Sequence, residues 1–244
     1  NNVQGASDVG LIPMMLPGYQ KVSDPAARTR FEKLWNCELD PNPGLTVVEI
    51  MHAIHHGNIK GMYIEGENPA MSDPNLNHAR KALSMLDHLV VQDIFFTETA
   101  SFADVILPAS AFAEKTGSFT NTDRRVQLGR QALNPPGEAR QDLWIIQQIA
   151  SRMGLNWTYQ GAEDVFAEIR QAMPVLAGIS WQRLSQEHSL TYPLEHEGDA
   201  GTPTIFTDGF PTASGRASFV AASYTHADEL PDADYPLIFT TGRQ

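Results

Sequence analysis

The chain has 244 residues, of which 42% are apolar and 19% charged, a composition that predicts a globular protein with a sizeable core. Its formal net charge is −12 with 17 Lys and Arg residues, so we expect no nucleic-acid partner, because neutralising phosphates requires clustered basic side chains. No apolar run approaches the roughly 18 residues that span a bilayer, so we expect no direct insertion into a membrane. The single cysteine, Cys37, excludes an internal disulfide and suits a reducing compartment.

Both ends of the sequence indicate a piece of a longer protein. The chain opens on Asn1 and Asn2 instead of a methionine. It stops shortly after Pro236–Phe239, an apolar run that is typical of a strand. We therefore expect the parent protein to continue on both sides.

Helices and strands alternate in the first half of the chain. Thr46 and Glu49 have the spacing of a capping box, which predicts a helix over Val47–His56. Asp73 is expected to cap a second helix, with proline at its first position. The segments that follow the first helix are a strand, this second helix, and a strand buried on both faces, over Lys60–Glu65, Asp73–Leu86 and His88–Phe95. This alternation predicts a right-handed α/β unit with a parallel sheet.

The second half is predicted to be helical and then irregular. Asp142 is expected to cap a helix that ends at Gly154, with Trp144 and Met153 in ordinary core positions. Another helix is predicted over Glu163–Met173. Beyond it, Pro, Gly and Thr become frequent around two short apolar runs, which indicates a linker leading to β structure, at Thr204–Phe206 and Ala217–Val220.

Two acidic turns follow the predicted parallel strands. Gly66, Glu67 and Asn68 come directly after the first strand, and Gln92-Asp93-Ile94 closes the second. Ligands of open α/β sheets bind beyond the carboxyl ends of the strands, so sheet geometry would bring these turns side by side. A carboxylate there can accept hydrogen bonds from a guanine edge or from ribose hydroxyls, while Gly66 lets the backbone approach a ligand. Spacing alone favours a plainer interpretation, in which these residues are helix caps or surface residues.

Other possible sites are weaker. His52, His55 and His56 have a helical spacing that could bring imidazoles to one metal, but a position at a helix carboxyl end explains them better. The sequence contains neither a G-x-G-x-x-G nor a P-loop motif, so a nucleotide would be held without a glycine fingerprint. We assign no catalytic residue and no metal ligand in this chain.

Two motifs resemble a known family. The run from Gln92 to Arg125 contains the segment Asp104–Pro108, which we expect to be a short buried strand, and the pattern E-x-x-G-S-F-x-N-x-D-R-R that starts at Glu114. This run resembles a cofactor-binding segment of the molybdopterin oxidoreductases. The first twenty residues, NNVQGASDVGLIPMMLPGYQ, resemble the formate dehydrogenase branch of that family, specifically its catalytic alpha subunit.

The resemblance implies a reaction for the parent. It would oxidise formate to carbon dioxide at molybdenum or tungsten held by two molybdopterin guanine dinucleotides (bis-MGD). Electrons would leave through a [4Fe-4S] cluster outside this segment toward iron-sulfur or flavin subunits, in the cytoplasm. The catalytic residues would lie upstream, so this chain alone should be inactive.

The resemblance also implies a fold and site residues. The fold is α/β: a parallel-sheet, Rossmann-like half-domain over residues 1–125 that binds the dinucleotide, a helical connecting region over 126–200, and the start of a C-terminal β-rich domain over 201–244. The residues implied to contact the guanosine are Gly66, Glu67, Asn68, Gln92, Asp93 and Ile94. Thr97 would contact the phosphate or ribose, and Asp123 would add a polar contact. Arg124 and Arg125 could reach a pyrophosphate or form a solvated pair, and Thr241, Gly242 and Arg243 would open the domain that holds the other dinucleotide.

Two alternatives remain. One is another member of the same superfamily, a nitrate reductase or the large iron-sulfur subunit of NADH dehydrogenase, although the N-V-Q-G-A-S-D-V-G and P-G-Y-Q motifs argue against both. The other is a non-enzymatic α/β interaction domain, in which Glu67 and Asp93 are only helix caps.

Overall fold

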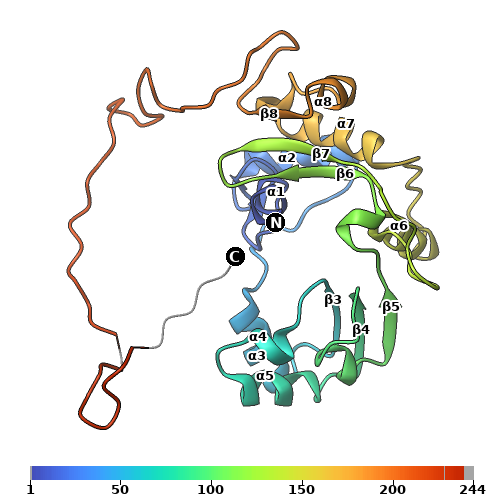
Figure 1. Cartoon of the computed structure of the whole chain (residues 1–244), viewed down its shortest axis with the longest axis vertical. Helices are drawn as coiled ribbons and strands as arrows, with labels where there is room; N and C mark the ends of the chain where they lie inside the picture. The colour runs from blue at the N-terminus through green and yellow to red at the C-terminus, as the bar shows by residue number, and fades with distance from the viewer. Residues whose placement is uncertain (1, 228, 239–244) are drawn as a thin grey trace. The chain divides into compact units, whose positions relative to one another are not determined.

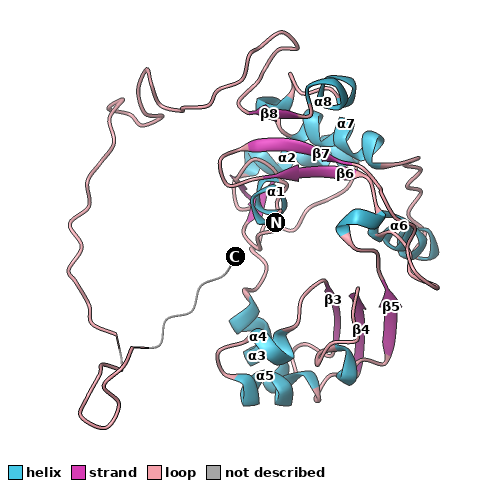
Figure 2. Cartoon of the chain, viewed as in Figure 1, coloured by secondary structure: helices cyan, strands magenta, loops and turns pink. Residues whose placement is uncertain are grey.

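The computed structural model describes residues 2–227 and 229–238. The chain forms two compact units, Asn1–Pro203 and Thr204–Gln244. The described residues of the second unit contain no helix and no strand, so the two apolar runs at 204–206 and 217–220 are irregular where β structure was predicted (Figure 2). A short apolar run forms a strand only when another strand supplies its hydrogen-bond partners, and the described part of this unit offers none.

A parallel sheet forms the α/β part of the first unit. Its strands are β3 (Gly61–Glu65), β4 (His88–Asp93) and β5 (Val105–Pro108), in the order β3-β4-β5. Helices α3 (Val47–His55) and α5 (Leu76–Leu83) pack on it through a cluster of buried aliphatic side chains (Figure 1). The predicted parallel α/β arrangement is therefore confirmed.

The start of α5 differs from the prediction. The side chain of Asn75, not that of Asp73, caps the helix, because its Oδ1 accepts a hydrogen bond from His78 N at 3.3 Å. Asp73 instead follows a short helix that the sequence analysis missed, α4 (Pro69–Ser72). Pro69 and Ala70 are buried, so packing against the core selects this extra turn of helix.

Two strands are less buried than predicted. Strand β4 ends at Asp93, whose Oδ1 accepts hydrogen bonds from the backbone N of Ile94 at 2.6 Å and of Phe95 at 3.4 Å. This local turn leads the chain out of the sheet, and Phe95 is 74% exposed. Strand β5 lies at an edge of the described sheet, where Val105 and Ile106 are each 40% exposed, so the prediction of a buried strand there was wrong.

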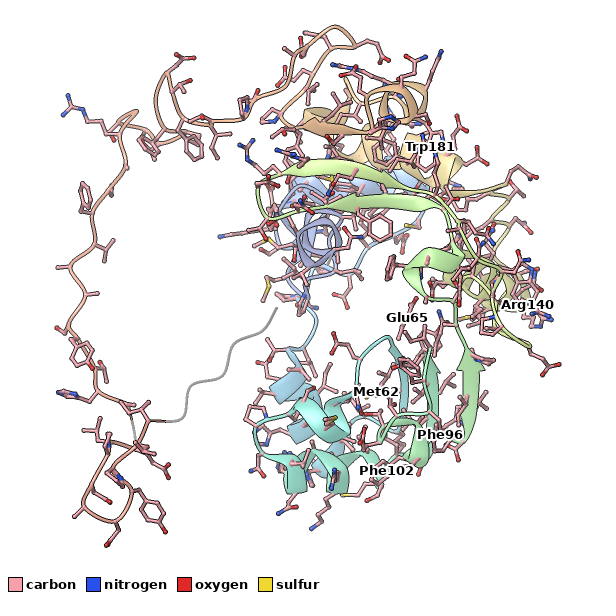
Figure 3. All side chains as sticks on the ribbon, in the orientation of Figure 1. Met62, Glu65, Phe96, Phe102, Arg140 and Trp181 are labelled. Carbon is pink, nitrogen blue, oxygen red and sulfur yellow. The ribbon has the colours of Figure 1, made fainter. Side chains whose placement is uncertain are left out.

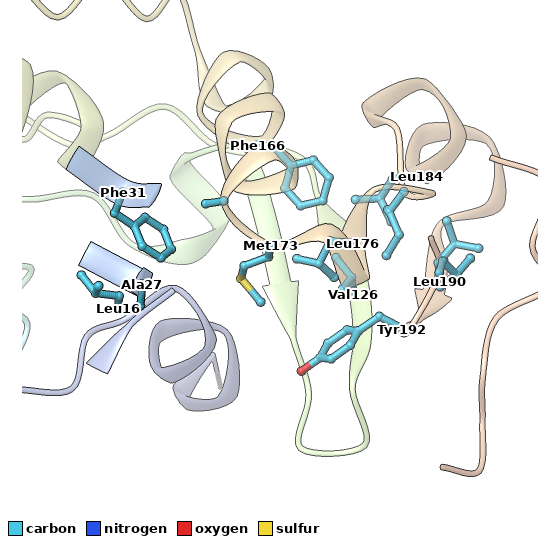
Figure 4. Packing of buried hydrophobic residues seen from close by; sticks show 13 residues of the cluster. Leu16, Ala27, Phe31, Val126, Phe166, Met173, Leu176, Leu184, Leu190 and Tyr192 are labelled. Atoms are coloured by element: carbon cyan, nitrogen blue, oxygen red, sulfur yellow. The ribbon is translucent and has the colours of Figure 1, made fainter. Parts of the chain in front are cut away.

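An antiparallel sheet forms the other part of the first unit. Its strands are β6 (Gly117–Thr120), β7 (Arg125–Gly129) and β8 (Ser189–Thr191), in the order β6-β7-β8. Buried side chains on this sheet share one core with those of the neighbouring helices (Figure 4). The remaining elements beside it are α1 (Val3–Asp8), β1 (Met15–Leu16), β2 (Gln20–Lys21), α2 (Pro25–Trp35), α7 (Ala162–Ala172) and α8 (Trp181–Glu187). Strand β8 and helix α8 lie within residues 126–200, where a helical connecting region was expected but no individual element was predicted between Met173 and Thr204.

Helix α6 (Asp142–Arg152) follows β7 along the chain and was only partly predicted. Its capping position is Gln141, and Asp142 is its first residue. The buried face consists of Ile145 and Ala150, whereas Trp144 is 50% and Met153 74% exposed. The prediction of core positions for Trp144 and Met153 was therefore wrong, because the helix turns a different stripe toward the protein.

Membrane-spanning helices are absent from the part of the chain that the structure describes, since none of its helices has the necessary length and apolar character.

Candidate functional site

The two acidic turns meet at the carboxyl ends of β3 and β4. Glu65 pairs with Gln92 in the parallel register, and the backbone N of Gly66 donates a hydrogen bond to Gln92 O at 2.9 Å. The residues that follow each strand therefore lie side by side, as the sequence predicted. We call the residues 65–68 and 92–94 the strand-end edge.

Two carboxylates of the strand-end edge have free acceptor atoms. Glu67 is exposed, and its side chain has no hydrogen-bond or ion-pair partner among the described residues. Asp93 uses Oδ1 for the turn at Ile94, and its Oδ2 receives no hydrogen bond from the described part of the chain. Gly66 has φ of +65°, which favours glycine, and the space where a Cβ would stand is open. The edge can therefore offer acceptors and bare backbone to a ligand.

Asn68 and Thr97 use their side chains to shape the neighbouring loop. Asn68 Oδ1 accepts hydrogen bonds from Thr99 N at 3.1 Å and Thr99 Oγ1 at 2.8 Å, while its Nδ2 donates to Glu98 Oε2 at 2.8 Å. That last bond lowers the pKa of Glu98. Thr97 Oγ1 accepts from Ala100 N at 3.2 Å, at the start of a 3₁₀ helix over Ala100–Phe102. Asn68 therefore holds the loop after β4 against the turn after β3, and Thr97 stabilises a turn within that loop.

Gln92, a residue of the strand-end edge, is fully buried in a polar network. Its Nε2 donates to Glu65 Oε1 at 3.1 Å and to Asp142 Oδ1 at 2.8 Å, and its Oε1 accepts from the Tyr63 hydroxyl. Glu65, the last residue of β3, is labelled in Figure 3. Lys115 Nζ forms an ion pair with Asp142 and donates to the backbone oxygen of Ser110 at 3.1 Å. All three polar positions of the Gln92 amide are thus occupied inside the protein.

The network raises the pKa values of two of its members, Glu65 and Tyr63. Burial raises the pKa of Glu65, the charge of Asp142 raises it further, and Lys115 opposes the shift. Burial, together with the charges of Glu65 and Asp142, raises the pKa of Tyr63 to about 12. The Tyr63 hydroxyl is therefore protonated at neutral pH and can donate to Gln92.

The predicted residues around Asp123 belong to a different place. Asp123 lies in the β6–β7 turn, pairs with Arg125 at 3.7 Å between Oδ2 and Nε, and lines a cavity of about 370 Å³. No hydrogen bond or ion pair within the described residues joins it to the strand-end edge. Arg124 donates to the backbone oxygens of Tyr192, of Thr202 at 3.0 Å and of Pro203 at 3.0 Å. Its guanidinium is committed to the fold, so the suggestion that it reaches a pyrophosphate was wrong.

Three predicted residues cannot be placed. Thr241, Gly242 and Arg243 lie outside the described residues.

The N-terminal motifs meet around the buried carboxylate of Asp8. Asp8 is 3% exposed and accepts hydrogen bonds from Gln4 Nε2 at 2.7 Å and from the Tyr192 hydroxyl at 2.6 Å. Gln4 Nε2 also donates to the Tyr19 hydroxyl at 3.1 Å. The characteristic residues of the N-V-Q-G-A-S-D-V-G and P-G-Y-Q segments therefore hold this part of the fold together.

The histidine side chains at the end of α3 lie within hydrogen-bond distance of backbone oxygens of helices. His55 Nε2 lies 3.1 Å from His78 O, and His56 Nδ1 lies 2.8 Å from His52 O. The rings of His55 and His78 are in contact, with centroids 4.1 Å apart. Within the part of the chain that the structure describes, no group of three or more His, Cys, Asp or Glu side chains has the arrangement of a metal site.

Asp142 and Lys115 are the candidate site residues that the sequence analysis missed. Asp142 was interpreted as a helix cap, and Lys115 was not singled out. Asp142 lies 50 positions from Gln92 in the sequence, so no local spacing indicates that the two meet. Only the position of Asp142 next to a predicted helix start hinted at a polar role.

The chain has an α/β fold with a parallel sheet, and open sheets of this kind bind ligands beyond their strand ends. The family model described as molybdopterin oxidoreductase matches residues 1–152, and the chain belongs to the molybdopterin oxidoreductase family. Membership of this family implies a molybdopterin cofactor with molybdenum or tungsten.

Individual relatives cover the whole chain. The chain is 49% identical to the F420-dependent formate dehydrogenase subunit alpha of Methanocaldococcus jannaschii, over 100% of this chain and 36% of that protein. It is 43% identical to a putative formate dehydrogenase of Bacillus subtilis, over 100% of this chain and 24% of the relative. The chain thus spans about a third or a quarter of these relatives. Acetylene hydratase from Pelobacter acetylenicus has the same fold, with a TM-score of 0.55 and 21% identity over 80% of this chain and 27% of that one.

Proposed function

We propose that this chain is the cofactor-binding part of a formate dehydrogenase alpha subunit, whose parent oxidises formate to carbon dioxide at a bis-MGD centre. The observation that carries the proposal is the hydrogen bond from Gly66 N to Gln92 O, at 2.9 Å, which sets Glu67 beside Asp93 at the strand ends. Similarity to formate dehydrogenase alpha subunits, at 49% and 44% identity over the whole chain, supports formate as the substrate.

The strand-end edge suits a guanine nucleotide. The N1-H and N2-H₂ edge of guanine needs acceptors that point outward, and Glu67 and the outer oxygen of Asp93 offer them. The open space at Gly66 lets a planar base approach the backbone, and Ile94, 48% exposed, can cover its apolar face. Asn68 and Gln92 have their polar groups engaged, so we propose that they hold the edge in shape. Thr97 Oγ1 only accepts a hydrogen bond within the described residues, so its hydroxyl could donate to the phosphate or ribose of the dinucleotide.

The other predicted residues extend this assignment. Asp123 would add a polar contact from its cavity at the β6–β7 turn, and Thr241, Gly242 and Arg243 would open the domain for the second dinucleotide. The division of the chain at residues 125 and 200 belongs to the same proposal. The bound metal supplies the two-electron chemistry, and the residues of this chain bind and orient the cofactor.

The remaining parts of the reaction would lie elsewhere in the parent. We propose that it carries a [4Fe-4S] cluster outside this segment and passes electrons to iron-sulfur or flavin subunits. The names of several relatives include coenzyme F420, which makes F420 a candidate final acceptor. The exposed free thiol of Cys37 is compatible with work in the reducing cytoplasm.

The activity can be tested on the full-length parent purified without oxygen. Formate-dependent viologen reduction should occur, and the same sample should release about two guanine nucleotides for each molybdenum or tungsten. A protein loaded with metal but inactive with formate would contradict the substrate. Absence of both metal and nucleotide would favour the NADH dehydrogenase-like protein or the interaction domain.

The assignment of the edge has its own test. Asp93→Ala in the parent should lower the guanine nucleotide content, because the base loses an acceptor. Asp87→Ala is the matched control, since Asp87 is an exposed carboxylate just before the amino end of the same strand. Equal nucleotide contents in the two variants would contradict a contact from Asp93.

A further inference from the structure

We propose that Asp142, supported by Lys115, is a positioning residue for the dinucleotide, acting through Gln92 on the strand-end edge. The inference rests on the proposed function. It gives the connecting segment before α6 a role at the site formed by the parallel sheet.

The start of α6 is attached to the same end of the sheet. Arg140 N donates to Pro108 O at 3.0 Å, and Ala109 and Arg140 form a parallel bridge just beyond β5. Two residues later, Asp142 Oδ1 accepts from Gln92 Nε2 at 2.8 Å. The backbone thus places this carboxylate beneath the strand-end edge, next to the fully buried Gln92 side chain.

The contacts fix one orientation of the Gln92 amide. Both hydrogens of Nε2 point at carboxylates, those of Glu65 and Asp142, and Oε1 accepts from Tyr63. A flipped amide would face two carboxylates with its oxygen, which is unfavourable in a buried place. Removing the Asp142 acceptor leaves a buried N–H without a partner.

The position of Gln92 decides the position of both turns. Its backbone oxygen holds Gly66 N, and the next residue is Asp93. A displaced Gln92 would therefore move the acceptors of the two turns relative to each other. We infer that Asp142 controls how tightly the edge holds the base without contacting it.

Lys115 balances the charges of the network. Glu65 and Asp142 share a single amide, and Lys115 Nζ pairs with Asp142. The raised pKa of Glu65 reflects its burial and the nearby Asp142, opposed by Lys115. Without the ammonium group, ionisation of Glu65 would put two uncompensated carboxylates against Gln92.

The test measures guanine nucleotide release from the metal-loaded full-length parent. Asp142→Ala should release it about tenfold faster, the effect of one hydrogen bond to a charged group. Glu163→Ala is the matched control, because Glu163 is an exposed carboxylate in the first turn of α7, which has the same length as α6. The control should release the nucleotide at the wild-type rate. In a double-mutant cycle, Asp142→Ala should add little to the effect of Gln92→Ala, because both remove the same contact.

A pH profile separates positioning from a general loss of fold. In Lys115→Met, release should accelerate as the pH rises through the raised pKa of Glu65, above the ordinary 4.5, because Glu65 and Asp142 then repel each other. Asp142→Asn in the Lys115→Met background keeps an acceptor for Gln92 without the charge and should restore slow release with a flat profile. Thermal unfolding of each variant shows whether it is folded.

The outcomes distinguish the two proposals. A wild-type parent with metal but no guanine nucleotide would overturn the dinucleotide assignment. A different result would overturn only the positioning role. In that case the wild-type parent contains the nucleotide, and the folded Asp142→Ala and Glu163→Ala variants release it equally fast. A flat pH profile for Lys115→Met would also overturn that role.

Discussion

The hydroxyl of Tyr192 donates a hydrogen bond to Asp8 Oδ2 at 2.6 Å, across 184 positions of the sequence. Burial raises the pKa of Tyr192 above its ordinary value, and the hydrogen bond and charge of Asp8 raise it further. The hydroxyl therefore stays protonated and donates throughout the physiological pH range. Through this bond the first helix of the chain is joined to the residue that follows β8.

Replacing Tyr192 should destabilise the chain. Tyr192→Phe leaves the buried Asp8 carboxylate with one partner fewer, and we expect the free energy of unfolding to fall by about 1–3 kcal/mol. Urea unfolding measures the change. Tyr224→Phe removes a hydroxyl from a tyrosine that is 81% exposed and should change nothing. Equal stabilities of the two variants would show that the Asp8 bond contributes little.

Thr99 should matter for its hydroxyl rather than for its shape. Its Oγ1 donates to Asn68 Oδ1 at 2.8 Å and accepts from Ala70 N at 3.0 Å, and the side chain is fully buried. Thr99→Val keeps the side-chain volume but leaves the Ala70 N–H without a hydrogen-bond partner. We therefore expect the free energy of unfolding, measured with urea, to fall by about 1–3 kcal/mol. Thr99→Ser keeps the hydroxyl and should lose less. A larger loss with serine would indicate that the methyl contact dominates.

Gly66 and Gly178 should tolerate alanine differently. Gly66 has φ of +65° with open space at its Cβ position, so Gly66→Ala should cost about 1–2 kcal/mol from backbone strain alone. At Gly178 a Cβ would stand 2.3 Å from His196 O, so alanine there must displace backbone and should destabilise more. Thermal unfolding of both variants checks the order. Gly66→Asn should recover part of the loss, because asparagine accepts the left-handed region more readily.

The contact between α3 and α5 should weaken in mild acid. Burial lowers the pKa of His78, and the charges of His55 and His52 lower it further, while Asp73 opposes the shift and Lys81 adds to it. The unfolded chain therefore binds a proton more readily than the folded one, so stability should fall as the pH drops below the ordinary value of 6.5 and level off below the lowered pKa.

Nuclear magnetic resonance titration of the His78 ring tests this electrostatic explanation. His55→Gln removes the nearest imidazole, whose ring centroid lies 4.1 Å from that of His78. We expect the His78 titration midpoint to rise toward 6.5 in this variant, because a repulsive charge is lost. An unchanged midpoint would show that the charge of His55 does not contribute to the shift.

Local signals in the sequence were sufficient for the elements that position the candidate site. The predicted capping box is present, with Thr46 N and Oγ1 both bonded to Glu49 Oε2, at 2.8 and 2.7 Å, and the helix it starts was placed within one residue. The alternation of helix and strand predicted the parallel sheet. The rule that ligands bind beyond strand ends predicted that the turns containing Gly66 and Asp93 lie side by side. The motifs from Gln92 to Arg125 indicated the family that the comparison confirmed.

Errors arose where packing selects among local possibilities. The apolar residues of α6 fit more than one helical stripe, and only the surrounding structure turned Ile145 inward and left Trp144 exposed. The sequence alone is compatible with Arg124 facing solvent or a ligand. The folded structure places the backbone oxygens of Tyr192, Thr202 and Pro203 around its guanidinium. Strand β8 is too short for a sequence pattern to predict it. It forms because β7 supplies hydrogen-bond partners along one edge.

The sequence by itself determined the local elements and the family, because capping, periodicity and motif spacing act within a few tens of residues. The tertiary structure alone decided that Asp142 meets Gln92 and that Asp8 meets Tyr192. A buried polar group needs a partner, but many distant residues could supply it. The folded chain selects that partner by the geometry with which sheets and helices pack.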